Sequence, residues 1–456
     1  MLGFAISTTA CSRGELTDPD DSASGPFADT CRPAPQPTVG QRFGDSDRQA
    51  ITSVAVDRHG YPLIAGGFRG TVELDGNVLH GPATPPNQVG TDALAPDGQL
   101  FVARLAPEGC SPFINSFGPA DLALNANVAT DAEDNVLFTT TYFGIVDFGG
   151  GPIQSSPSNT YGAAIAKYGP SGEHQWSLGI TSSSTVATVG KAATDALGNI
   201  YIAGYFEWEL SVGGAILGKS LERDGFVVKL DPAGNIVWSK ILKLSMKHET
   251  NLTITVSPEG TSTISGECAQ DPSGVPVDLG GGPQMEVSGS GFVTRFDTNG
   301  NHLWGKVLPN RIQASATDST GATFLVHDAP PETLAVTKLD AFGVEVSTVT
   351  PPLETYWGYA REGRHLVVGP DGAPILFGGL AQEGATVLAA QLTSEGAIAW
   401  SRRYTTSGEF GPRVDIALGL SGRMWVAGSF EGDLDLGQGT LSSAGSSDAF
   451  LAEIAP

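Results

Sequence analysis

The residue types that most often carry catalysis or bind metals are few in this sequence and widely separated. No histidine has a partner at metal-ligand spacing, and the cysteines form no Cys-x-x-Cys pair. We therefore expect no metal and no other cofactor, and we interpret the histidines as single surface residues at unrelated repeat positions. The histidines are His59, His80, His174, His248, His302, His327 and His365. The cysteines are Cys11, Cys31, Cys110 and Cys268.

Acidic turns raise the alternative of calcium binding. Two examples are residues 131–135 and 297–301. An EF-hand loop needs glycine at its sixth position and glutamate at its twelfth, whereas the second segment has His302 and Leu308 there. Asp, Asn and Gly also supply the side-chain bonds and the positive φ of a tight turn, so we expect hairpin turns.

An aromatic segment is the strongest candidate for ligand binding. Residues 352–364 contain Tyr356, Trp357, Tyr359 and Arg361, which are residue types enriched at binding hot spots. We expect Trp208 in another loop on the same face. These residues predict a recognition patch, and the alternative is that the rings fill a hydrophobic gap between two irregular repeats.

The composition indicates a folded, turn-rich protein that positions these residues on β-strands. The 456 residues include 60 glycines and 30 prolines, with 40% hydrophobic and 16% charged residues. The net charge of −24 repels nucleic acid and anionic membranes, so we expect neither as a partner.

A repeated pattern supplies the main structural prediction. A turn related to Asp-x-x-Gly ends the first strand of each copy, and the third strands alternate apolar and polar residues. The turn recurs at Gly60, Asp134, Gly198, Gly260, Gly321, Gly372 and Gly422. The third strands are FVARL (101–105), AIAKY (164–168), FVVKL (226–230), FVTRF (292–296), AVTKL (335–339), LAAQL (388–392) and FLAEI (450–454). The pattern predicts an all-β, seven-bladed β-propeller with four-stranded antiparallel blades.

Two further features of the repeat concern packing. A ring follows the second turn by four residues in most copies, as in Trp176, Trp238 and Trp304, which favours packing between adjacent sheets. The last copy lacks a fourth strand, so residues 37–44 are expected to complete the seventh blade and remove its free edge.

The segments VDFGGG (146–151) and VDLGGG (277–282) occur together with Asp-x-Phe-[Val/Leu]-x-Lys-Leu and Gly-Asn-x-x-Trp-Ser-Lys. This combination resembles a seven-bladed β-propeller repeat family of exported myxobacterial-type proteins, over residues 37–456. The resemblance implies a propeller outside the cytoplasm, and the family has no general activity that it would transfer.

The amino terminus is consistent with export. Residues 1–11 resemble the end of a lipoprotein signal in which Cys11 would carry lipid, and residues 12–36 are rich in Asp, Ser and Pro like a flexible tether. The alternative for Cys11 is an irregular amino terminus without lipid. Cys31 and Cys110 are a candidate disulfide, and Cys268 would then be free. We expect an extracytoplasmic monomer on the outer surface, in the periplasm or secreted, with no membrane contact beyond a lipid anchor.

Two classes of function remain. The favoured one is a binding or scaffold module for an unknown protein or glycan, without catalytic residues. The alternative is an exported propeller enzyme, a lyase or hydrolase acting on carbohydrate. A segment similar to the repeat of quinone-cofactor dehydrogenases, residues 230–238, lacks the threonine before glycine and has a shorter Asp-to-Trp spacing. No Gly-x-Ser-x-Gly elbow and no Walker loop are expected, and the inner strands are mostly Ala, Val, Thr and Gly, so we expect no enzyme.

Overall fold

The computed structural model is all-β, because every regular element within the described residues is a strand. The predicted signal remnant, the tether and Cys11, Cys31 and Cys110 lie outside those residues. The described residues are 40–74, 77–82, 98–106, 112–118, 122–156, 160–183, 186–245, 252–268, 276–284, 290–329, 333–351, 364–380, 386–393, 397–408, 410–419, 422–437, 439–445 and 447–454.

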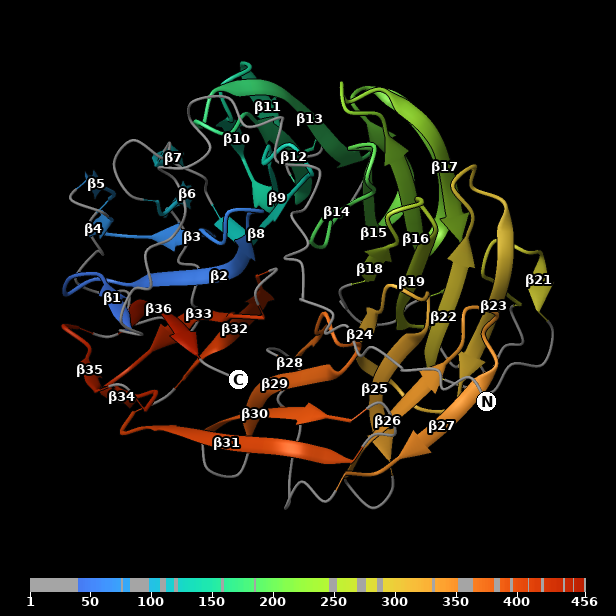
Figure 1. Ribbon diagram of the computed structural model, residues 1–456. Helices are drawn as coiled ribbons and strands as arrows, with labels where there is room; N and C mark the ends of the chain where they lie inside the picture. Colours follow the sequence, from blue (N-terminus) through green and yellow to red (C-terminus); the bar gives the residue numbers. More distant parts are fainter. Residues whose placement is uncertain are drawn as a thin grey trace, which may run out of the picture.

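Figure 1 shows the sheets arranged one after another around a central axis, with the first and last coloured segments side by side. The strands nearest the axis contact each other in a closed cycle. They are β2 (Gln49–Val56), β8 (Leu122–Thr130), β14 (Ala193–Thr194), β18 (Thr253–Val256), β24 (Ile312–Thr317), β28 (Arg364–Val368) and β32 (Phe410–Leu418). Antiparallel sheets that radiate from a common axis define a β-propeller.

Each inner strand begins an antiparallel sheet that runs outward through three more strands. The second strands are β3 (Pro62–Phe68), β9 (Val136–Phe143), β15 (Ile200–Val212), β19 (Ser262–Glu267), β25 (Thr323–Ala329), β29 (Pro374–Leu380) and β33 (Met424–Phe430). The third strands are β6 (Gln99–Arg104), β12 (Gly162–Tyr168), β16 (Ala215–Leu230), β22 (Gly291–Phe296), β26 (Thr333–Leu339), β30 (Thr386–Leu392) and β36 (Asp448–Ile454). The outer strands are β7 (Phe113–Phe117), β13 (His174–Ser182), β17 (Ile236–Leu242), β23 (His302–Leu308), β27 (Glu345–Val349), β31 (Ile398–Thr406) and β1 (Gln41–Phe43).

Short hairpins extend this plan at the rim. They are β4 (Thr71–Leu74) with β5 (Asn77–His80), β10 (Ile145–Asp147) with β11 (Pro152–Gln154), β20 (Val277–Asp278) with β21 (Pro283–Gln284), and β34 (Asp433–Asp435) with β35 (Thr440–Ser442). The far end of β15 pairs with β13 and thereby joins two sheets. Strand β34 pairs with β31 and extends another sheet.

The chain closes on itself as the sequence predicted. Strand β1 pairs antiparallel with β36, with Gln41 opposite Leu451 and Phe43 opposite Ala449. Arg42 also lies 2.5 Å from the buried carboxylate of Asp448. The amino-terminal strand therefore covers an edge that the last copy would otherwise leave open.

The first turn of each copy has the backbone that its glycine was expected to supply. Gly198 has a φ of 74°, and Asp134 occupies the equivalent place in another copy at 59°. The carboxylate of Asp195 accepts hydrogen bonds from the backbone N–H of Leu197 at 3.0 Å and of Asn199 at 2.9 Å. Asp297 makes the same two contacts in the calcium candidate, to Asn299 and Asn301. These carboxylates act as turn-forming groups.

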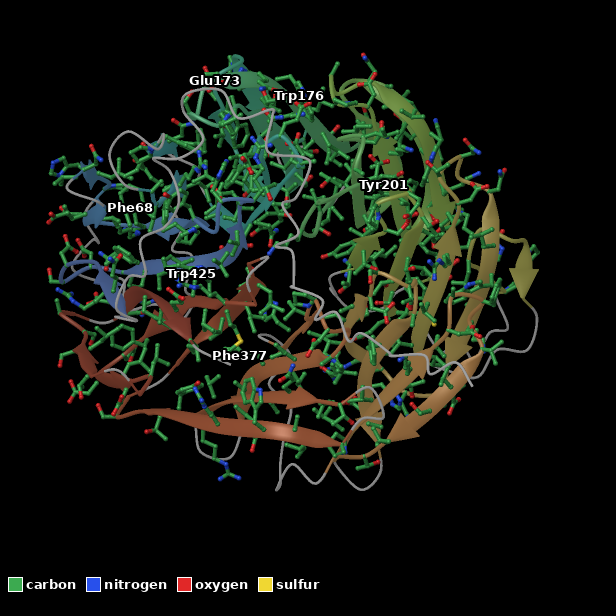
Figure 2. The ribbon with its side chains drawn as sticks, in the orientation of Figure 1. Phe68, Glu173, Trp176, Tyr201, Phe377 and Trp425 are labelled. Carbon is green, nitrogen blue, oxygen red and sulfur yellow. The ribbon has the colours of Figure 1, made fainter. Side chains whose placement is uncertain are left out.

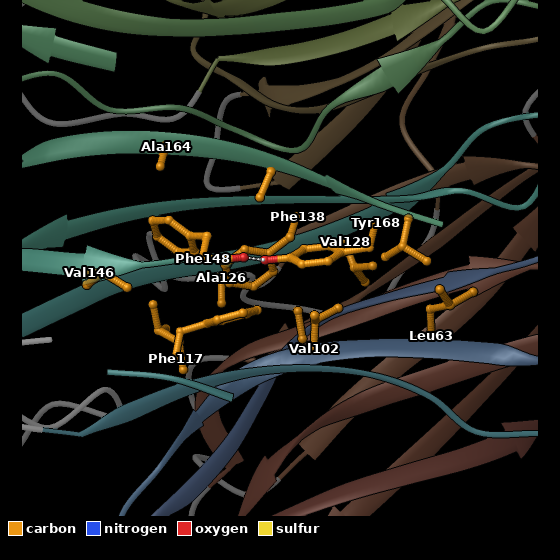
Figure 3. Packing of buried hydrophobic residues seen from close by; sticks show 14 of the residues in the cluster. Leu63, Val102, Phe117, Ala126, Val128, Phe138, Val146, Phe148, Ala164 and Tyr168 are labelled. Atoms are coloured by element: carbon orange, nitrogen blue, oxygen red, sulfur yellow. Dashed lines mark hydrogen bonds between the residues drawn. The ribbon is translucent and has the colours of Figure 1, made fainter. Parts of the chain in front are cut away.

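The hydrophobic core lies between neighbouring sheets. Figure 3 shows Phe117 of β7 against Phe138 of β9 and Phe148, at ring-centroid distances of 5.4 Å in both cases. Tyr168 of β12 is fully buried in the same cluster, and its hydroxyl donates to the carbonyl of Phe148. Both faces of a sheet are thus hydrophobic, and each sheet packs against the next through them.

The tryptophans of the outer strands have the predicted packing role. Trp176 lies at the rim of the ring in Figure 2, and its indole N–H donates to the carbonyl of Pro232 in the next sheet at 3.1 Å. A Cβ on Gly234 would lie 3.0 Å from that indole, so the turn glycine also makes room for the ring. Trp238 makes the equivalent bond to Thr298. Ring and turn therefore join adjacent sheets at the rim.

Candidate functional site

Four polar side chains from four different sheets meet near the axis of the ring, and we call them the central cluster. Ser53 comes from β2, His365 from β28 and Asp415 from β32, while Lys191 lies two residues before β14. No two of them are neighbours in sequence. The closed ring alone brings them together.

Asp415 is the centre of this cluster. One carboxylate oxygen accepts from the Ser53 hydroxyl at 2.8 Å and from the Val54 backbone N–H at 2.9 Å. The same oxygen lies 3.1 Å from the Lys191 ammonium. The other oxygen lies 3.0 Å from Nδ1 of His365.

The electrostatics of the cluster follow from these contacts. Burial would raise the pKa of Asp415, but Lys191 and His365 outweigh it and hold that pKa well below its usual range. The Asp415 side chain is 7% exposed, whereas those of Lys191 and His365 are 38% and 34% exposed. The cluster thus has a buried, ionised carboxylate and presents two nitrogen-bearing groups to solvent.

All four residues occupy one position of the repeat, four residues before the first residue of the first turn. The equivalent residues are Ser53, Asn127, Lys191, Thr253, Ala314, His365 and Asp415. Inner strands were expected to carry mainly Ala, Val, Thr and Gly, and that expectation was wrong at this position. Reading this one column across the copies would have found the cluster, because it contains an acid, a base and an imidazole.

The geometry allows two kinds of chemistry. When Nδ1 of His365 is protonated and donates to Asp415, Nε2 is left to accept a proton or to bind a ligand. The Lys191 ammonium donates to the carbonyl of Val54 at 2.7 Å as well as to Asp415, which leaves one of its three protons for a ligand. The cluster is suited to holding an acidic group or to moving a proton.

Of the residues predicted to form the aromatic patch, Trp208 is within the described part of the structure. Tyr356, Trp357, Tyr359 and Arg361 lie outside the described residues, in the connection from β27 to β28. Trp208 does not lie in a loop as expected, but in strand β15, which continues past its sheet in a long hairpin with β16. Its side chain is 46% exposed and its φ is 68°.

Three histidines differ from the expectation of single surface residues. His365 is paired with Asp415 in the central cluster. His174 and His302 share one repeat position, two residues after the second-turn glycine, and their rings lie against Tyr168 and Phe296. Glycine runs cover both, since a Cβ on Gly150 or Gly281 would lie 2.6 Å or 2.4 Å from the imidazole beneath. Burial lowers the pKa of His302, as expected for a packed ring.

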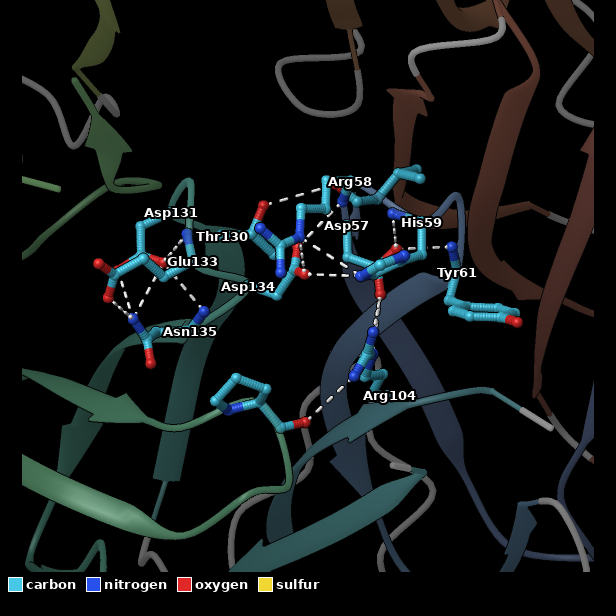
Figure 4. Close-up of polar contacts among 12 residues, drawn as sticks. Asp57, Arg58, His59, Tyr61, Arg104, Thr130, Asp131, Glu133, Asp134 and Asn135 are labelled. Atoms are coloured by element: carbon cyan, nitrogen blue, oxygen red, sulfur yellow. Dashed lines mark hydrogen bonds and ion pairs between the residues drawn. The ribbon is translucent and has the colours of Figure 1, made fainter. Parts of the chain in front are cut away.

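A second polar network near the turns is structural. Figure 4 shows the guanidinium of Arg104 bound to the buried carboxylate of Asp57, with a further bond to the carbonyl of Pro170 in the next sheet. Lys167 lies 3.0 Å from Asp131 in the equivalent place. A basic residue on the third strand thus fixes the first turn of its own sheet and contacts the second turn of the neighbour.

One motif was overlooked at the level of sequence. Residues 213–220, GGAILGKS, match the spacing of a phosphate-binding Walker loop, contrary to expectation. In the structure Gly213 and Gly214 form a hairpin turn and the rest is strand β16, with no helix behind it. Lys219 is bound to Glu209 at 2.7 Å on the surface. The phosphate-binding geometry is therefore missing from this hairpin.

Cys268 is not a candidate nucleophile. Its side chain is buried, and burial raises the pKa of its thiol to about 12. Within the described ranges, no group of three or more His, Cys, Asp and Glu side chains is placed to hold a metal ion. The same part of the chain contains no helix with the length and hydrophobicity needed to cross a membrane.

Comparisons with known proteins give only distant similarity. No protein-family model matches the chain. An uncharacterised WD repeat-containing protein of Acanthamoeba polyphaga mimivirus is 23% identical over 319 residues, which is 59% of this chain and 23% of that protein. The chain thus spans less than a quarter of the curated relative it matches.

Solved structures show the same low level of similarity. A protein of unknown function from Dyadobacter fermentans is 11% identical, with 92% of this chain and 99% of that chain covered and a TM-score of 0.47. BamB from Moraxella catarrhalis is 13% identical, with 88% and 85% covered and a TM-score of 0.41. At these values neither assigns a function to this chain.

Proposed function

We propose that this chain is a seven-bladed β-propeller that acts as a binding or scaffold module outside the cytoplasm. The blade count is supported by the closed cycle of inner strands from β2 to β32 and by the pairing of β1 with β36. A ring of this kind is rigid, and its connecting loops differ in length between copies. Rigid rings with variable loops are suited to recognition.

The extracytoplasmic location is supported by the sequence. Residues 1–11 resemble a lipoprotein signal with Cys11 as the lipid acceptor, and residues 12–36 have the composition of a tether. A disulfide between Cys31 and Cys110 would fit an oxidising compartment. The resemblance to exported myxobacterial-type propellers agrees with the same location.

The central cluster is where we place the ligand, which is a protein or a glycan. The observation that carries this proposal is the convergence of Ser53, Lys191, His365 and Asp415 from four sheets at one repeat position. Packing alone needs only small residues there, as Ala314 shows in its own copy. The predicted aromatic residues Tyr356, Trp357, Tyr359 and Arg361, together with Trp208, are a second proposed contact surface.

The test is binding of the purified chain to an array of glycans and to cell-envelope fractions. We expect Lys191→Met to weaken retention by at least tenfold. Lys219→Met is the matched control, because Lys219 is 75% exposed on the β15–β16 hairpin and should be neutral. Equal retention of Lys191→Met and the parent chain by every fraction that binds would contradict the placement of the ligand.

A carbohydrate lyase or hydrolase is the second candidate function. It is favoured by one observation, the contact between Asp415 and Nδ1 of His365, which would position Nε2 as a base. Release of new reducing ends from a retained polysaccharide, lost in His365→Gln, would establish this function. If a polysaccharide is retained and no product forms in a prolonged incubation, the enzyme alternative is refuted and the binding function remains.

A further inference from the structure

We propose that the central cluster binds the carboxylate of a hydroxylated acid, such as a sugar acid. This rests on the proposed function, which places the ligand at the cluster, and adds the chemical class of that ligand.

The charge of the cluster argues for a negatively charged ligand group. Asp415 and Lys191 cancel each other, at a distance of 3.1 Å between Oδ2 and Nζ. The exposed ends of the cluster are both nitrogens, the third donor position of Lys191 and Nε2 of His365. An ammonium and an imidazolium are the groups that bind a carboxylate by charge-assisted hydrogen bonds.

The neighbouring strands add little charge of their own. Strand β29 (PILFGGL), which pairs with β28, and strand β24 (IQASAT) of the neighbouring sheet contain no acidic or basic residue. Arg364 and Arg413 lie close to His365 and Asp415 in sequence, and their side chains are outside the described part of the structure. Asp415 is the charged group that contacts His365 among the described side chains, and Lys191 contacts the other oxygen of the same carboxylate.

Two other residues at the same repeat position indicate why the bound acid should carry hydroxyl groups. Asn127 and Thr253 hold this position on β8 and β18, and both are partly exposed. Their side chains form no hydrogen bond to another described residue, whereas the Ser53 hydroxyl is used by Asp415. An amide and a hydroxyl at the level of the charged residues suit the hydroxyl groups of a sugar ring.

Titration calorimetry with D-glucuronate on the intact chain tests this inference. One molecule of glucuronate should bind per chain, because the chain forms one central cluster. This measurement uses the native protein and needs no variant.

Variants and comparison ligands complete the test. His365→Gln should weaken glucuronate binding by at least tenfold, whereas His80→Gln, at an exposed position on β5, should leave it unchanged. Glucose should bind at least tenfold more weakly than glucuronate, and glutarate, which has the acid but no hydroxyls, should lie between them. A thermal melt of each variant establishes that it is folded.

The outcomes separate this inference from the proposed function. Equal binding of glucose and glucuronate, or equal binding of glucuronate by His365→Gln and the parent chain, would overturn the inference. If an envelope fraction is still retained through Lys191 in that case, the binding module stands and only the ligand class is wrong. If the chain binds neither glucuronate nor any envelope fraction, both the inference and the proposed function are refuted.

Discussion

Replacement of Asp415 by alanine gives the sharpest test of the central cluster as a structural unit. The substitution leaves the hydroxyl of Ser53 and the backbone N–H of Val54 without an acceptor, and both are buried. Each unsatisfied buried donor costs about 1–3 kcal/mol. Lys191 and His365 are about a third exposed, so water replaces part of their contact and we add nothing for them.

The expected loss is therefore about 2–6 kcal/mol in the free energy of unfolding. At roughly 2.1 cal/mol/K per residue, the unfolding entropy of a ring of this length is about 0.9 kcal/mol/K, so the melting temperature should fall by about 2–7 °C. Glu222→Ala is the control, because Glu222 is exposed on β16 and should change the free energy by less than about 0.5 kcal/mol. The assay is thermal unfolding followed by circular dichroism at pH 7.

The pH dependence of the same pair of proteins gives a second, independent reading. The pKa of Asp415 is lower in the folded than in the unfolded state, so the unfolded state binds the proton more readily as the pH falls below about 4. The stability that Asp415 contributes is present above that pH and is lost below it. The difference in melting temperature between the parent chain and Asp415→Ala should shrink from pH 7 to pH 3. A difference below about 1 °C at pH 7, or one that is unchanged at pH 3, would refute the reasoning.

Two more predictions concern the rim and the core. Trp238→Ala should lower the free energy of unfolding by about 2–4 kcal/mol, because it removes a half-buried ring and the indole hydrogen bond to Thr298. Val237→Ala, at the neighbouring exposed position, should be nearly neutral, and equal urea midpoints for the two variants would contradict the packing role. The thiol of Cys268 should resist iodoacetamide at pH 8 in the folded protein and react after unfolding, because it is buried and its pKa is raised to about 12. Mass spectrometry of the labelled residue measures this, and rapid labelling of the folded chain would contradict the prediction.

Much of the architecture could be predicted because its causes are local. A glycine or an acidic residue at the end of each first strand fixes a turn through φ and through hydrogen bonds within five residues, as at Asp195 and Gly198. Alternation of apolar and polar residues identified the third strands as strands but predicted that only one face is buried, which was wrong, because β12, β22 and β36 are buried along their whole length. The pairing of β1 with β36 was also predictable, because the last copy lacks a strand that the amino-terminal segment resembles. The tryptophan row could be interpreted as packing for the same reason, since it repeats at one offset from one turn.

Only the tertiary structure decided where polar chemistry collects. Ser53, Lys191, His365 and Asp415 share one repeat position but belong to four copies, so the residues around each of them do not show that the four side chains meet. His174 and His302 looked like surface histidines because the glycine runs that cover them lie more than twenty residues away in sequence. The physical reason is the same in both cases: a turn or a strand is determined by neighbours along the chain, whereas a buried charge is determined by the partners that ring closure brings within hydrogen-bonding distance.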